Sequence, residues 1–135
     1  MTEKTSFFHG PRPSADKFPN AVRVGDLVFT SGNVAFDENG EVFAPGDCAA
    51  QADLVFSRLS ELLDKAGSSI KHVIKINAYI TDPADYSAYN EIRHRWFAED
   101  PPASATVVCQ LMNEELAVEV EAIAMVAGND ETEND

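Results

Sequence analysis

The chain has 135 residues, which is enough for one hydrophobic core and too few to fill two. Its formal net charge of -13 opposes binding to a phosphate backbone, because no stretch gathers the 10 basic residues into a patch. Cys48 and Cys109 stand far apart and indicate neither a disulfide framework nor a metal site, and no apolar run is long enough to span a membrane. We therefore expect one cytoplasmic domain over residues 1–127, followed by an acidic tail over 128–135.

Two short apolar runs predict a β-hairpin in the first quarter of the chain. The runs cover residues 21–24 and 27–31, and Gly25-Asp26 between them has the composition of a tight turn. Gly32-Asn33 ends the second strand. Both strands are short, and loop-forming residues lie on either side of the hairpin.

Apolar residues then recur at intervals of three and four, which is typical of an amphipathic helix. Asp47 is suited to cap the start of this helix, and Gly67 is suited to end it. The apolar positions are Ala52, Val55, Phe56, Leu59, Leu62 and Leu63.

Residues 72–81 alternate between two kinds of side chain, as a strand with one packed face requires. The pattern assigns Ile74, Ile76, Ala78 and Ile80 to one face and Lys75, Asn77 and Tyr79 to the other. The second set is too polar to be packed under a helix.

A second helix is predicted after this strand. Asp82 is suited to cap it, Pro83 is suited to its first position, and it should end near Phe97. Its apolar positions are Tyr86, Tyr89, Ile92 and Trp96. Pro101-Pro102 then interrupts the chain.

Two further strands, over 104–111 and 116–126, complete the order ββαβαββ. This order predicts an α+β sandwich of two layers, in which a mixed sheet carries both helices on one face. Glu119 and Glu121 should then project from the other face, together with the polar residues of 72–81. A sheet face with these residues beside apolar ones favours subunit association around a polar interior.

The chain resembles the RidA (YjgF/YER057c/UK114) family over nearly its whole length. The matching segments are Thr30-Ser31-Gly32, Ala66-Gly67, Asp82, Tyr89-Asn90, Pro102-Ala103 and the run from Val118 to Ala124. The resemblance implies a chorismate-mutase-like fold and a homotrimer with ligand clefts at its subunit interfaces. It also implies hydrolysis of reactive enamines and imines without a cofactor, although other members are described as endoribonucleases or translation inhibitors.

The resemblance also implies a set of site residues. Glu121 matches the glutamate that orients water, although a carboxylate paired with Lys75 inside the trimer is an equal alternative. The substrate-binding positions implied are Phe18, Ser31, Asn90, Ser104 and Thr106, the last acting through its main chain. For Ser31 the alternative is a strand-end side chain that caps a turn, and for Asn90 it is a solvent-facing or helix-capping side chain.

Two departures from the family pattern bear on the substrate. Ser104 stands where the deaminases of amino-acid-derived imines have an Arg that clamps the substrate carboxylate, and Phe18 stands where they have Tyr. A serine lacks both the charge and the fork geometry of a guanidinium. Of the other possible clamps, Arg23, Arg93 and Arg95, the last two lie on a helix face that is expected to be solvated.

These features leave more than one function open. The first hypothesis is a divergent enamine or imine hydrolase whose substrate is not 2-aminoacrylate, with Glu121 positioning water. The second is a trimer that binds a small molecule or a partner without catalysis, which the missing Arg favours. An endoribonuclease is the third, and the negative charge opposes it.

Overall fold

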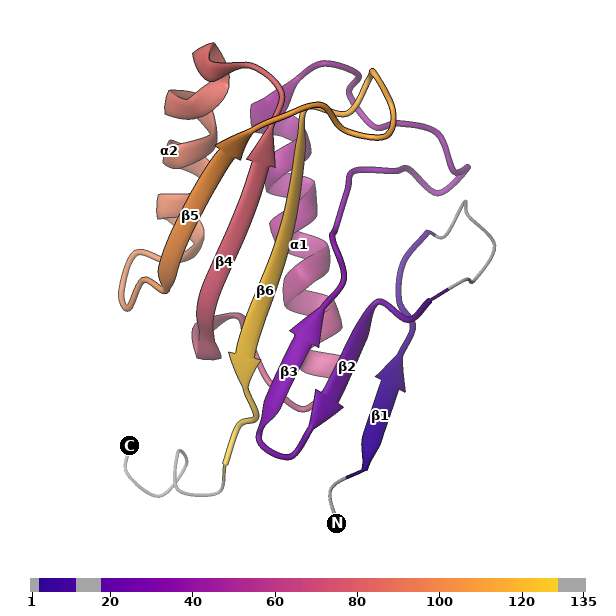
Figure 1. Ribbon diagram of the computed structural model, residues 1–135, viewed down its shortest axis with the longest axis vertical. Coiled ribbons are helices and arrows are strands. Elements are labelled where there is room, and N and C mark those ends of the chain that lie inside the picture. Colours follow the sequence, from indigo (N-terminus) through magenta and orange to yellow (C-terminus); the bar gives the residue numbers. More distant parts are fainter. Residues whose placement is uncertain (1–2, 12–17, 129–135) are drawn as a thin grey trace.

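Six strands form one mixed sheet, and two helices cover one of its faces (Figure 1). The computed structural model describes residues 3–11 and 18–128, so the expected acidic tail lies outside the described residues from position 129 onward. This is the two-layer α+β architecture that the sequence predicts. No helix in the described ranges is long and apolar enough to cross a membrane.

The strands follow an order in which the last one in the chain lies inside the sheet. They are β1 (Lys4–Phe7), β2 (Ala21–Val24), β3 (Leu27–Thr30), β4 (Val73–Ile80), β5 (Ala103–Val108) and β6 (Val118–Met125). Their order across the sheet is β1-β2-β3-β6-β4-β5, with β4 and β5 parallel and the other pairs antiparallel. The predicted hairpin is β2 and β3. The sequence pattern did not predict β1, whose residues are mostly exposed.

The helices begin where the sequence places their caps. Helix α1 (Cys48–Lys65) starts at Asp47, whose carboxylate accepts a hydrogen bond from the backbone N–H of Ala50 at 3.0 Å. It is followed by Gly67, whose φ of +87° favours glycine. Asp82 caps a short 3₁₀ helix, η2 (Pro83–Asp85), that leads directly into α2 (Tyr86–Trp96).

The core lies between the helices and the covered face of the sheet. Phe56 of α1 is fully buried, and its ring lies 6.1 Å from that of Tyr89 and 5.5 Å from that of Phe97. All six predicted apolar positions of α1 are buried. The hydroxyl of Tyr89 is also buried, and it has no hydrogen-bond partner among the described residues.

A buried amide fixes the start of β6 against α1. The side chain of Gln51 is fully buried and donates to the carbonyls of Ala44 and Glu115, each at 3.0 Å. Its oxygen accepts from the N–H of Ala117 at 2.8 Å. Because the amide is satisfied on both sides, Gln51 ties the segment before β6 to the helix layer.

The predicted alternation along β4 is wrong at Ile74, which is 41% exposed. Val73 pairs with Ala124 and Lys75 pairs with Ile123, so β4 carries one extra residue between these pairs. This bulge places Val73 in the core in place of Ile74. From Ile76 onward, the alternation follows the prediction.

Candidate functional site

Polar side chains from β4 and β6 meet on the face of the sheet that no helix covers. The register pairs Tyr79 with Glu119 and Asn77 with Glu121. Their neighbours along both strands are buried under the helices, so these four side chains project from the opposite, open face. Figure 1 shows β4 and β6 side by side in front of α1.

Two donors hold the carboxylate of Glu121. The side-chain amide of Asn77 and the hydroxyl of Tyr79 each donate to Glu121 Oε2 at 3.1 Å. Within the described part of the chain both bonds end on the same oxygen, so Oε1 is left for another donor such as water. The hydrogen bond to Glu121 is the main reason that the pKa of Tyr79 is raised, so its hydroxyl stays a donor at neutral pH.

These contacts bear on the alternative in which Glu121 pairs with Lys75. Lys75 lies opposite Ile123, two pairs further along the ladder, while Asn77 and Tyr79 bond the carboxylate. Sequence reasoning missed both of these partners of Glu121. The alternation placed them on the right face, but only the strand register brings them beside the carboxylate.

Glu119 lies on the same face, against the end of β3. A Cβ atom built on Gly32 would lie 2.7 Å from Glu119 Cδ, so the carboxylate occupies the space that a side chain at position 32 would need. Burial, and then the neighbouring Glu121, raise the pKa of Glu119 above its ordinary value.

The end of β3 is irregular at this point. Phe29 pairs with Ile123 and Asn33 pairs with Val120, so the β3 side has one more residue than β6 between the two pairs. The hydroxyl of Thr30 accepts from the N–H of Ala122 at 2.9 Å inside this irregular stretch. The extra residue brings the Thr30-Ser31-Gly32 segment beside Glu119.

Ser31 makes local bonds at this corner. Its hydroxyl donates to the carbonyl of Pro19 at 2.8 Å, and its N–H donates to the carbonyl of Asn20 at the same distance. These are the contacts of a strand-end serine that fixes a turn. A ligand would have to use the remaining lone pairs of the hydroxyl.

The other predicted binding residues do not lie around Glu121 within one chain. Ser104 pairs with Ile76 and Thr106 pairs with Ala78, so both project from β5 on the helix side of the sheet. Asn90 is on α2 and accepts from two nitrogens of Arg93, at 3.2 and 2.8 Å. Phe18 lies shortly before β2 and is 58% exposed.

The three arginines considered as carboxylate clamps are engaged elsewhere. Arg93 bonds Asn90, and Arg95 pairs with Glu91 at 3.3 Å on the surface of α2. Arg23 donates to the carbonyl of Ala66 at 3.3 Å, on the helix side of the sheet. Within one chain, none of them reaches the open face beside Glu121.

The two cysteines are free thiols. Burial, with smaller contributions from Asp85 and Asp47, raises the pKa of Cys48 to about 12, so this thiol is protonated and inert at neutral pH. Cys109 follows β5 and is partly exposed.

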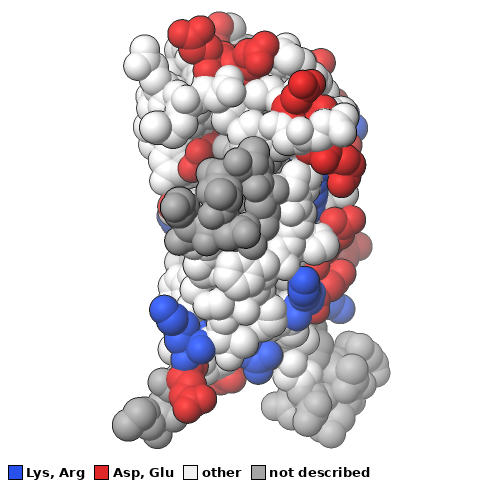
Figure 2. Space-filling view, turned by 90° about the vertical axis from the view of Figure 1, so that its right-hand side faces the viewer, with Lys and Arg blue, Asp and Glu red and all other residues white. Residues whose placement is uncertain are grey.

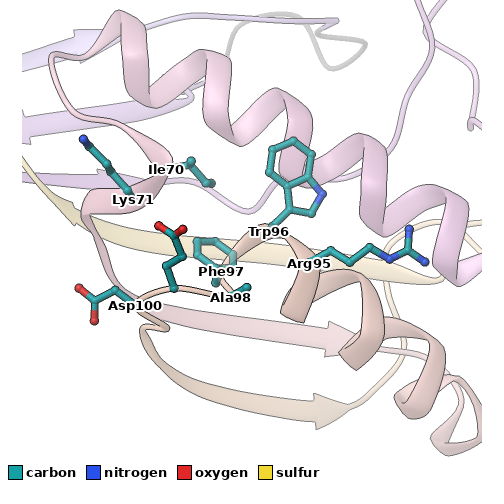
Figure 3. Close-up of a pocket in the computed structure, with 8 residues that line it drawn as sticks. Ile70, Lys71, Arg95, Trp96, Phe97, Ala98 and Asp100 are labelled. Carbon is teal, nitrogen blue, oxygen red and sulfur yellow. The ribbon is translucent and has the colours of Figure 1, made fainter.

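A pocket of about 460 Å³ lies away from the open face, between the 3₁₀ helix η1 (Ile70–His72) and the end of α2. Figure 3 shows Trp96 and Phe97 in the middle of its lining, with Lys71 and Arg95 at opposite ends and their charged groups pointing apart. The two cations therefore do not converge on one anion. The residues that line it are Ile70, Lys71, Arg95, Trp96, Phe97, Ala98, Glu99 and Asp100, of which Arg95 alone was considered for substrate binding, as a possible carboxylate clamp.

Comparison with known proteins gives consistent matches over most of the chain. The sequence model of the family described as Endoribonuclease L-PSP matches residues 10–126. The 3-aminoacrylate deaminase RutC of Acinetobacter baylyi is 34% identical over 116 residues, which cover 86% of this chain and 91% of the relative.

Solved structures of similar proteins have the same fold. The structure of RidA from a Psychrobacter species is 32% identical, with a TM-score of 0.76 over 84% of this chain and 91% of that one. A Mycobacterium tuberculosis protein described as a member of the YjgF/YER057c/UK114 family is 28% identical, with a TM-score of 0.78 over 92% of this chain and 100% of that one.

Proposed function

Because this chain belongs to the RidA (YjgF/YER057c/UK114) family, we propose that it hydrolyses a reactive enamine or imine to a carbonyl compound and ammonia. The relative from Acinetobacter baylyi carries the name of an aminoacrylate deaminase, and an aminoacrylate is an enamine. The reaction needs water from the solvent, a group that orients this water, and proton transfer, and side chains can supply the last two without a cofactor.

The hydrogen-bonded carboxylate of Glu121 is the main support for this activity. Asn77 and Tyr79 fix Oε2 in one orientation, so Oε1 can hold a water molecule against an electrophilic carbon. As the water attacks, the same carboxylate accepts its proton. Glu121 is therefore the catalytic residue that we propose.

The substrate that we propose lacks the small amino-acid carboxylate of 2-aminoacrylate. The family resemblance implies a clamping Arg at the position where this chain has Ser104. A serine at that position favours a neutral polar group on the substrate. Phe18 in place of Tyr makes the expected wall of the cleft less polar.

We further propose that the active form is a cytoplasmic homotrimer whose open sheet faces pack together. Apolar side chains on this face, at one end of the sheet, are 36–45% exposed, namely Val24, Leu27, Phe29 and Met125. In one chain the predicted residues Asn90, Ser104 and Thr106 lie on the helix side of the sheet, so a cleft that they share with Glu121 requires a neighbouring subunit. A monomer in sedimentation experiments would contradict this assembly.

Replacing Glu121 with glutamine tests the proposed reaction. We expect Glu121→Gln to lower ammonia release from enamines generated in solution by about 100-fold or more, because the amide cannot accept the proton of water. Glu41→Gln, at an exposed loop position, is the matched control and should keep the parent rate. Undiminished release by Glu121→Gln, with release by the parent protein well above background, would remove Glu121 from the mechanism.

A trimer that binds a small molecule without converting it is the second candidate, and Ser104 in place of the Arg is the feature that favours it. It predicts a ligand that raises the melting temperature of the protein and is recovered unchanged.

An endoribonuclease is less favoured. Figure 2 shows Lys and Arg side chains as separate groups, mostly in the lower half of one face, with Asp and Glu at its upper end and also beside these groups. Binding of RNA that weakens as the salt concentration rises would support the endoribonuclease alternative.

A further inference from the structure

The open face holds a second carboxylate, Glu119, whose surroundings differ from those of Glu121. We propose that Glu119 is the general acid of the reaction and protonates the substrate, while Glu121 handles the water. This inference rests on the proposed hydrolase activity and adds a second catalytic residue to it.

The geometry places both carboxylates on one small area of the sheet. Glu119 and Glu121 are two residues apart on β6, so both side chains project from the open face. Tyr79 links them, since it lies opposite Glu119 in the register and donates its hydroxyl to Glu121. A substrate bound over Tyr79 would lie between the carboxyl group of Glu119 and that of Glu121.

The two groups have different neighbours. Glu121 accepts two hydrogen bonds at one oxygen, as suits a carboxylate that orients water. Glu119 lies over the backbone of Gly32, which carries no charge. Its titratable neighbours on this face are Glu121 on β6 and Tyr79 on β4. Burial and the nearby Glu121 raise the pKa of Glu119, so this group holds a proton more readily than an ordinary glutamate does.

The proton transfers balance over one turnover. The carboxyl group of Glu119 gives its proton to the carbon of the enamine, which becomes an iminium ion. Water then adds to the iminium carbon as its proton passes to Glu121, and a neutral carbinolamine forms. Glu121 returns that proton to the nitrogen, the C–N bond breaks and ammonia leaves, while the carbinol O–H gives its proton to Glu119. Both groups are then back in their starting states.

Gly32 has a defined part in this arrangement. Any larger residue would take the space that the Glu119 carboxylate occupies. Because the displaced group is the end of a flexible side chain, Gly32→Ala should move the carboxylate with little disturbance of the fold. The glycine is therefore a positioning residue for the proposed acid.

The test compares Glu119→Gln with the parent and with Glu41→Gln on the same enamine. We expect kcat/KM of Glu119→Gln to fall by about 100-fold, while the oligomeric state and the rate of Glu41→Gln stay at the parent values. The parent rate should fall at high pH as Glu119 loses its proton, and this fall should disappear in the variant. Glu119→Asp, which keeps an acid, should recover part of the rate.

Each outcome separates this inference from the proposed function. If the parent hydrolyses the enamine and Glu119→Gln does so equally well, Glu119 is not the acid, although the proposed function stands. If the parent hydrolyses no enamine, the proposed function itself fails. If Glu119→Gln does not fold, Gly32→Ala replaces it, and an unchanged rate and pH profile in that variant would overturn the role of Glu119.

Discussion

The two faces of the sheet differ in how far the aromatic side chains that lie against them are exposed to solvent. On the covered face, Phe56 and its neighbours are packed out of contact with water, whereas Phe29 on the open face is 42% exposed. The alternation of side chains along β6, and along β4 from Ile76 onward, produces both faces from the same two strands. One face therefore supplies the stability of the fold, and the other is the face to which we assign association and chemistry.

The polar groups on the two faces differ in the same way. On the open face, each donor near Glu121 has an acceptor, and one carboxylate oxygen receives two hydrogen bonds. On the covered side, the buried hydroxyl of Tyr89 lacks a partner among the described residues. Paired donors therefore surround the carboxylate to which the reaction is assigned, whereas among the described residues of the core Gln51 is satisfied and the Tyr89 hydroxyl is left unsatisfied at some cost in stability.

The largest contrast should come from truncating one phenylalanine on each face. We expect Phe56→Ala to reduce the free energy of unfolding by about 3–5 kcal/mol, because it leaves a cavity in a packed core. Phe29→Ala should instead weaken association, so that its melting temperature depends strongly on protein concentration. Denaturant unfolding and sedimentation at several concentrations measure the two effects, and equal losses of monomer stability would contradict the division between the faces.

A smaller effect is expected from removing the unpaired hydroxyl in the core. Tyr89→Phe keeps the ring that contacts Phe56 and deletes only the buried oxygen. We expect a gain in unfolding free energy of about 1 kcal/mol at most, because the parent loses the hydration of this hydroxyl without replacing it. Thermal unfolding of the two proteins side by side measures the change. A clear loss of stability would mean that a bound water satisfies the hydroxyl.

The smallest effect should be a change in how stability depends on pH. The folded state raises the pKa of Glu119 above its ordinary value of 4.5, so it binds this proton more tightly than the unfolded chain does. The resulting stabilisation is complete below 4.5 and is lost as the pH rises through the folded-state pKa. Glu119→Gln, which has no such proton, should therefore gain stability relative to the parent between acidic and neutral pH. Melting curves that differ by the same amount at both pH values would contradict this.

The sequence predicts much of the fold because most elements carry strong local signals. The spacing of apolar residues in α1 and the caps at Asp47 and Asp82 leave little choice of boundary. The pattern fails at Ile74 because a bulge shifts the alternation by one residue, and a bulge depends on the partner strand. It also misses β1, whose four residues are mostly exposed and gain their structure from pairing with β2.

Less of the candidate site follows from the sequence alone. Glu121 could be selected from its motif, and alternation placed it on the open face. Its partners Asn77 and Tyr79 depend on the register between β4 and β6, which no local pattern encodes. The approach of Gly32 to Glu119 depends on an extra residue at the end of β3. Whether Ser104 and Thr106 reach Glu121 depends on a second chain, because in one chain they project from the helix side of the sheet.

The position of β6 has a consequence for how the protein is made. This strand lies between β3 and β4, so it joins the N-terminal part of the sheet to the part formed by β4 and β5 (Figure 1). During synthesis on the ribosome, the first five strands emerge before the strand that unites them. Until then the two partial sheets expose unpaired edges, which is the condition in which nascent chains aggregate or recruit chaperones. The carboxylates of β6 therefore reach their places in the last step of sheet assembly, so only a chain with a completed sheet presents both of them on the open face.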